Sequence, residues 1–192
     1  MAKYVKTEDG YQEIETTVSP IVETKMDANN PVGTGSFSMG RKSGSVIGTN
    51  SHAEGFNTTA SGESSHAEGA STTASGIFSH AEGDTTIASG DHSHAEGSST
   101  TASSYQSHAE GYGTIASGED SHAEGLYTIA KSSNQHVQGI YNVEDSQDKY
   151  AHIVGNGKNE TTRSNAYTLT WSGIPWYQGR PQFGGTAMDN GS

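Results

Sequence analysis

Residues 51–64 read SHAEGFNTTASGES, and residues 65–78 read SHAEGASTTASGIF. The pentad Ser-His-Ala-Glu-Gly keeps a spacing of 14 residues without any insertion and begins at Ser51, Ser65, Ser79, Ser93, Ser107 and Ser121. A second motif, Ala-Ser-Gly, lies between most successive pentads. Such a constant period is typical of solenoid and array proteins, in which each repeat stacks on its neighbours.

A finer period of seven residues runs through the same segment. Alanine occupies every seventh position from Ala53 to Ala130, Val137 continues the series, and glycine follows two residues later at most steps. The leading members of the two series are Ala53, Ala60, Ala67, Ala74, Ala81, Ala88, Gly55, Gly62, Gly69 and Gly76. A coiled coil has the same period but needs large apolar residues at two positions of each heptad. Since each glycine inside a helix also costs about 1 kcal/mol, the pattern predicts short strands and turns.

Strand alternation divides each pentad between two faces. Ser51, Ala53 and Gly55 are expected on one face and His52 and Glu54 on the other, with glycine at a corner of positive φ. Two strand-turn units make one coil of 14 residues, and successive coils stack about 4.8 Å apart.

So narrow a coil has an interior for alanine, threonine and an occasional isoleucine, such as Ile87, Ile115 or Ile129. Burial stabilises by only about 25 cal/mol per Å² of apolar surface, and alanine offers little surface to offset the ordering entropy. We therefore expect several columns to associate side by side, in a number that the geometry leaves open.

The run from Ser51 to Ala130 resembles the left-handed parallel β-roll in the heads of trimeric autotransporter adhesins, with its Ser-x-Ala-x-Gly steps. It resembles more closely the Ser-His-Ala-Glu-Gly arrays of phage tail and neck-appendage proteins. Both resemblances imply a homotrimer. Autotransporters have a signal peptide and a C-terminal membrane barrel, and because we recognise neither pattern here, we expect a phage or prophage protein.

Three regions follow from the repeat and its flanks. Residues 1–31 predict a β-hairpin around Glu8-Asp9-Gly10, which serves as a docking segment for another particle protein or is a partly ordered tail. Residues 32–135 form the β-roll. Residues 136–192 contain both tryptophans and most bulky strand-forming residues of the second half, so they predict a β cap that seals the roll.

The cap resembles the C-terminal intramolecular-chaperone, self-cleaving domain of phage tailspike and appendage proteins, the peptidase G2 family. The matching stretches are residues 136–139, 152–157 and 163–169. The resemblance implies trimerisation, assistance to upstream folding and, in some members, cleavage of the chain's own peptide bond by acidic residues near the junction before the roll. Asp27 and Glu54 are the candidate catalytic residues, because residues 28–53 between them contain no Asp or Glu.

The histidines and glutamates of the pentads are expected to form columns on one face of the stack. We favour a hydrogen-bonded ladder in which each imidazole offsets the repulsion between stacked carboxylates. Facing imidazoles and carboxylates also suit a divalent metal, for which His52, Glu54, His66 and Glu68 are the candidate ligands. His92 is expected to be solvated at a coil corner.

Composition excludes several classes of function. The formal net charge is −12, and the ten basic residues are scattered, which argues against nucleic acid as a partner. There is no cysteine for thiolate sites, no apolar run long enough to insert in a membrane, and no cofactor-binding motif. We expect synthesis in the bacterial cytoplasm without a signal peptide, and location in a virion or tail particle.

The sequence thus predicts an all-β, homotrimeric, left-handed parallel β-roll of 14-residue coils with a C-terminal β cap. As function we expect a structural phage tail fibre, appendage or attachment component. One alternative is a self-cleaving trimerisation chaperone. Another is an adhesin for a host-surface glycan or protein receptor, in which Trp171 and Trp176 are stacking platforms, although we favour these tryptophans as the core of the cap.

Overall fold

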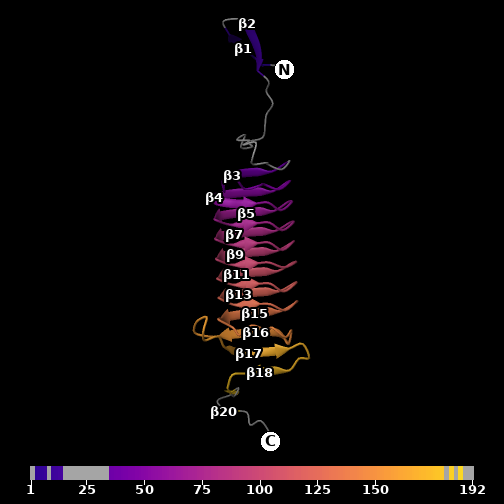
Figure 1. Cartoon of the computed structure of the whole chain (residues 1–192), viewed down its shortest axis with the longest axis vertical. Coiled ribbons are helices and arrows are strands. Elements are labelled where there is room, and N and C mark those ends of the chain that lie inside the picture. Colours follow the sequence, from indigo (N-terminus) through magenta and orange to yellow (C-terminus); the bar gives the residue numbers. More distant parts are fainter. Residues whose placement is uncertain (1–2, 8–9, 15–34, 180–181, 184–185, 188–192) are drawn as a thin grey trace.

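The chain forms a stack of strands with their directions across the long axis (Figure 1). The computed structural model describes residues 3–7, 10–14, 35–179, 182–183 and 186–187. All regular elements in these residues are strands and none is a helix, so the prediction of an all-β fold is confirmed.

Each coil of the stack contributes one long and one short strand. The long strands are β4 (His52–Ala60), β5 (His66–Ala70), β7 (His80–Asp84), β9 (His94–Ser98), β11 (His108–Tyr112), β13 (His122–Leu126) and β15 (His136–Ile140). The short strands are β6 (Thr73–Ala74), β8 (Ile87–Ala88), β10 (Thr101–Ala102), β12 (Ile115–Ala116) and β14 (Ile129–Ala130). β4 covers both positions of its coil and joins the two faces into one sheet.

Successive coils pair in parallel with a constant register. His52 lies opposite His66, and Ala60 lies opposite Ala74, an offset of 14 residues on both faces. The same offset continues through β13 and β14. The predicted β-solenoid of 14-residue coils is therefore confirmed.

Irregular strands stand at both ends of the stack. β3 (Phe37–Arg41) pairs in parallel with β4 and has a bulge between Met39 and Arg41, so the first coil is irregular. β16 (Tyr150–Asn156) pairs in parallel with β15, after which β17 (Asn165–Thr170) and β18 (Pro175–Tyr177) add in antiparallel order. The sheet runs unbroken across residue 135, so no gap in the pairing marks the expected start of the cap.

Two short hairpins lie outside the stack in sequence. β1 (Lys3–Thr7) and β2 (Gly10–Ile14) pair antiparallel, which matches the hairpin expected in residues 1–31. β19 (Gln182–Phe183) pairs with β20 (Thr186–Ala187). The docking role of the first hairpin stays a prediction.

The interior of the stack is a column of alanines. All the alanines of the seven-residue series from Ala53 to Ala130 are fully buried, and the larger Ile47, Val137 and Ile153 lie at the two ends of this column. The serine that opens each pentad and the threonine five residues after the pentad alanine are also buried. In this series Ser65 Oγ donates to the carbonyl of Gly62 over 2.8 Å, which ties the strand to the preceding turn.

The expectation that isoleucines enter the interior is wrong. Ile87 is 41% exposed, Ile115 is 37% exposed, and Ile129 is only partly buried. Each of them directly precedes a buried alanine of a short strand, so alternation turns its side chain outward.

Glycine is required by close stacking more than by the corners. Gly55 is exposed rather than on the buried face, and it is part of a strand although its φ is +108°. A Cβ placed on it would lie 2.1 Å from the carbonyl oxygen of Gly69 in the next coil. Apart from Gly113, the corners of the repeat hold non-glycine residues of positive φ, such as Asn57 and Ser64. The predicted glycine corner is therefore replaced by a glycine contact between coils.

Candidate functional site

The pentad histidines form one continuous column on the face of the long strands. Rings from His52 to His136, extended by His152 of β16, stack with centroids 4.6–5.0 Å apart and interplanar angles of 2–18°. Phe37 packs edge-on against the first ring, and Tyr167 packs edge-on against the last. The parallel register of the strands produces this column, because it places each histidine directly over the previous one.

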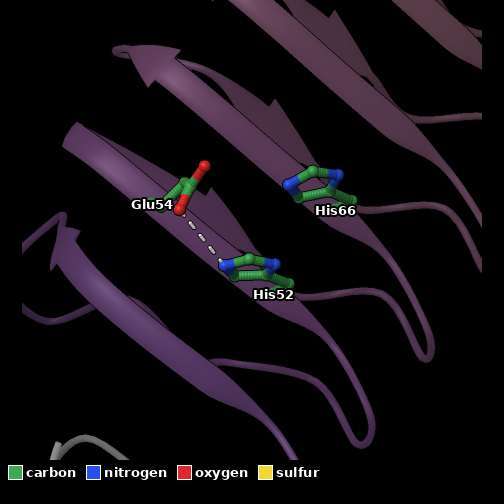
Figure 2. Close-up of side chains that lie close together, drawn as sticks. All are labelled: His52, Glu54 and His66. Atoms are coloured by element: carbon green, nitrogen blue, oxygen red, sulfur yellow. Dashed lines mark ion pairs between the residues drawn. The ribbon is translucent and has the colours of Figure 1, made fainter.

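The glutamates form a second column beside the histidines, on the same face. Figure 2 shows the carboxylate of Glu54 turned toward His52, with 3.5 Å between Oε2 and Nε2, and His66 above on the next coil. Glu68 lies between two coils, 4.0 Å from Nε2 of His66 and 3.9 Å from Nε2 of His80. Four further pairs along the stack have distances of 3.3–4.0 Å: Glu82 with His94, Glu96 with His108, Glu110 with His122 and Glu124 with His136. We call these two columns the His–Glu ladder.

Most imidazoles of the ladder lack a hydrogen bond at Nε2. The geometry of a hydrogen bond is met between His108 and Glu96, at 3.3 Å. In the described part of the chain, the Nε2 atoms of the other ladder histidines are out of contact with solvent and have no hydrogen-bond partner: His52, His66, His80, His94, His122, His136 and His152. The structure thus brings the two columns together as predicted but does not make them the expected hydrogen-bonded ladder.

Partial burial alters the titration of three ladder histidines. Desolvation, followed by the proximity of neighbouring histidines, lowers the pKa of His66, His94 and His152 below the usual 6.5. Near pH 7 these imidazoles are therefore mostly neutral. As neutral rings, these three imidazoles can offset the repulsion between stacked carboxylates only through hydrogen bonds and not as cations.

The ladder gathers the candidate metal ligands. His52, Glu54 and His66 bring their ligand atoms within 4.8 Å of one another, and so do His94, Glu96 and His108. Two further groups contain one histidine and two glutamates, namely Glu68, His80 and Glu82, and Glu110, His122 and Glu124. The candidate ligand Glu68 therefore belongs to a different group from His52, Glu54 and His66.

The two candidate catalytic carboxylates stand in different situations. Glu54 belongs to the ladder, where its close partner is an imidazole. Asp27 lies outside the described residues, as do residues 28–34 of the expected cleavage junction. Self-cleavage therefore stays a prediction.

His92 is exposed at a corner with φ of +59°, as expected, and it stacks on Phe78 with centroids 5.1 Å apart.

Both tryptophans of the cap lie at the surface of the chain. Trp171 is 47% exposed and Trp176 is 54% exposed, so the expectation that they form the core of the cap is wrong for the single chain. Trp176 lines an open hollow of about 750 Å³ together with Tyr150, Arg163, Asn165 and Gln178. β18, which presents Trp176, pairs with β17 alone, so one of its edges has no strand neighbour in the described part of the chain.

Three buried polar residues close the C-terminal end of the alanine column, and the periodicity of the sequence did not predict them. The side-chain amide of Asn142 accepts from the Ile129 N–H over 2.8 Å and donates to the Ile129 carbonyl over 3.0 Å, as a further strand would. Asp145 Oδ2 accepts from the N–H groups of Lys149 and Tyr150, both at 2.7 Å. Gln135 occupies the serine position of the pentad and donates to the Tyr150 carbonyl over 2.8 Å. In the sequence, the replacement of serine by glutamine in the seventh pentad was the signal that could have indicated this closure.

Arg163 fastens the loop before β17 to the side of the stack. Its guanidinium donates to the carbonyls of Tyr127 and Asn142 over 2.9 and 3.2 Å and lies 5.6 Å from the ring centre of Tyr141. Tyr112, Tyr127 and Tyr141 form an aromatic column along this edge, with centroids 5.3 and 5.0 Å apart.

A comparison with protein families matches the same repeat. Residues 53–79, 81–103 and 109–130 match the family model described as the YadA head domain repeat. The repeat array is of the trimeric-autotransporter-head type. The match covers less than half of the chain and leaves the cap outside. A search of curated proteins finds no match.

Within the described residues, no helix has the length and apolar character that crossing a membrane requires.

Proposed function

We propose that the chain is a homotrimeric structural module of a bacteriophage or prophage tail, working as a fibre, appendage or attachment component. The observation that carries the oligomeric part of the proposal is the interior of the 14-residue coils, where alanine is the apolar residue and serine and threonine are buried beside it. Such an interior buries too little apolar surface to hold an isolated column together. The column therefore needs lateral partners, and identical chains with the same repeat length match it coil for coil. The tail location rests on the resemblance of the Ser-His-Ala-Glu-Gly array to the arrays of phage tail and neck-appendage proteins.

The outer surface supports association between columns. Ile87, Ile115 and Leu126 are among the large apolar side chains that remain more than one-third exposed, and Phe78, Tyr112 and Ile140 are exposed as well. Tyr112, Leu126 and Ile140 lie opposite one another on three successive long strands and form an apolar strip, and surfaces of this kind mark protein–protein contacts. The likeness of the repeat to heads of trimeric autotransporters favours three chains.

Sedimentation equilibrium of the purified full chain tests the trimer. A mass of three chains, each of 20.1 kDa, is expected. A folded monomer would refute the proposal. Electron microscopy of particles labelled with an antibody against this chain then tests the location, since labelling of a tail is expected and labelling of a cell surface would contradict it.

The alternative function is a self-cleaving trimerisation chaperone, and it rests on the resemblance of the cap to the peptidase G2 family. Intact mass spectrometry separates the two functions, because an undivided chain of 20.1 kDa excludes self-cleavage.

An adhesin is favoured by one specific observation, the hollow of the cap. There an exposed indole from Trp176 lies with the side-chain amide of Gln178, and this combination suits the stacking and hydrogen bonding of a sugar ring. Binding on a glycan array that Trp176→Ala abolishes would support this function. Equal binding by that variant would exclude the hollow as the site.

A further inference from the structure

The His–Glu ladder holds metal-ligand atoms at repeated, regular positions on a rigid scaffold. In the first unit, one ring nitrogen each of His52 and His66 and a carboxylate oxygen of Glu54 lie within 4.8 Å of one another (Figure 2). The unit recurs as His94, Glu96 and His108. Each histidine pair comes from neighbouring parallel strands, so the sheet presets the spacing of the two imidazoles.

The donor set selects a class of metal. Two imidazole nitrogens and one carboxylate suit divalent late first-row ions, above all Zn²⁺, and hard ions such as Ca²⁺ and Mg²⁺ prefer sites made of oxygen alone. Tetrahedral Zn²⁺ with bonds of about 2.0–2.1 Å brings its ligands to roughly 3.4 Å from one another. The rings of each pair are stacked 4.8 Å apart and nearly parallel, so both must tilt out of the stack before their lone pairs converge on one ion. The ladder side chains are partly exposed, which leaves room for this tilt without moving the strands.

Both units contain a ring nitrogen without a partner. The Nε2 atoms of His52, His66 and His94 are out of contact with solvent and have no hydrogen-bond partner. Glu54 of the same unit lies 3.5 Å from His52, whereas the carboxylates at 4.0 Å from His66 and His94 are Glu68 and Glu82 of the neighbouring group. A buried nitrogen without a hydrogen bond is unfavourable. A cation between the imidazoles and the carboxylate would satisfy the nitrogen lone pairs and the negative charge together.

We propose that the ladder binds divalent transition-metal ions, Zn²⁺ in the first place, at His52–Glu54–His66 and at His94–Glu96–His108. Three protein ligands hold each ion, and water or a group from a sister chain takes the remaining position. The two sites are three coils apart, about 14 Å along the stack, so their ions repel each other weakly. Each ion links two successive coils through side chains and thereby stiffens the column.

The two remaining groups bind Zn²⁺ less well. Each has one imidazole and two carboxylates, and each shares one coil with a proposed site. We therefore expect about two tightly bound ions per chain rather than four.

The test is metal content and affinity of the full chain without a polyhistidine tag. After EDTA treatment and dialysis against Zn²⁺, elemental analysis is expected to find about two ions per chain, and calorimetry is expected to give matching stoichiometry. Co²⁺ in place of Zn²⁺ is expected to give the intense visible absorption of a four-coordinate ion. Less than one ion per chain by elemental analysis would overturn the proposal.

Matched variants locate the sites. Glu54→Gln with Glu96→Gln preserves shape, and Gln138 already stands at the glutamate position of the seventh pentad. This double variant is expected to weaken Zn²⁺ binding at least tenfold, while the control His92→Asn, outside the ladder and at a corner that suits asparagine, leaves it unchanged. Unchanged affinity in the double variant, or loss of binding in the control, would refute the assignment. Circular dichroism in EDTA checks that all three proteins remain folded.

Discussion

Replacing Gly83 by alanine tests whether the coils stack as closely as the structure has them. Gly83 lies near the end of a long strand with φ of +104°, and a Cβ there would stand 2.1 Å from the carbonyl oxygen of Gly97. A carbon and a carbonyl oxygen approach to roughly 3.3 Å, so the two coils must separate locally by about 1 Å. Backbone bonds nearby, such as Ser99 N–H to Asp84 O at 2.8 Å, would then exceed hydrogen-bond length.

The loss of stability in Gly83→Ala has two parts, the strain of positive φ on alanine and the broken hydrogen bonds between coils. Positive φ on alanine costs about 1–2 kcal/mol, and the loss of two backbone hydrogen bonds costs about 1 kcal/mol each. Gly83→Ala should therefore lower the free energy of unfolding by about 3–4 kcal/mol. Gly44 provides the matched control, because its φ is +80° and no atom lies within 4 Å of the position that an added Cβ would take. Gly44→Ala should cost only the conformational part, about 1–2 kcal/mol.

Thermal unfolding followed by circular dichroism measures the difference. At equal protein concentration, Gly83→Ala should melt about 4–8 °C below Gly44→Ala, since 1 kcal/mol corresponds to about 2–4 °C for a chain of this size. Equal melting temperatures for the two variants would show that the coils do not approach each other at the glycines, and the stacking argument would be wrong.

Three further predictions concern the repeat and its ladder. Deletion of residues 79–92 removes one full coil and should leave a soluble oligomer, whereas deletion of residues 79–85 places unlike half-coils over one another and should give aggregation in size-exclusion chromatography. Ala88→Leu overfills a fully buried position and should cost at least about 1–3 kcal/mol by thermal melting, and the outward Ile87→Leu should be nearly neutral; equal melting of both would contradict the tight interior. In EDTA, the melting temperature should fall as the pH drops below about 6.5, because the pKa of His66, His94 and His152 is lowered in the folded chain and the unfolded chain therefore binds protons first. A melting temperature that rises on acidification from pH 6.5 would contradict the last prediction.

The repeat fold could be predicted from the sequence because the same residue types recur at the same positions of every coil. Alanine at each seventh position identified the buried column correctly, since every one of these alanines from Ala53 to Ala130 is fully buried. The fixed spacing of 14 residues likewise determined that His52 stands over His66 and that the histidines and glutamates share a face. These features depend on periodicity alone, and the period of a repeat can be read directly from its sequence.

Tertiary structure decided what periodicity leaves open. The direction of Ile87 depends on its place in a strand of two residues, which alanine spacing does not specify. The exposure of Trp176 depends on which strands cover the cap, and the closure of the column depends on Asn142, whose amide imitates a strand only once Ile129 lies beside it. In the ladder, the sequence placed the columns, but only the folded side chains showed imidazole nitrogens close to carboxylates without hydrogen bonds. Spacing along a chain sets which residues meet, whereas the distances and angles at which they meet arise from packing in three dimensions.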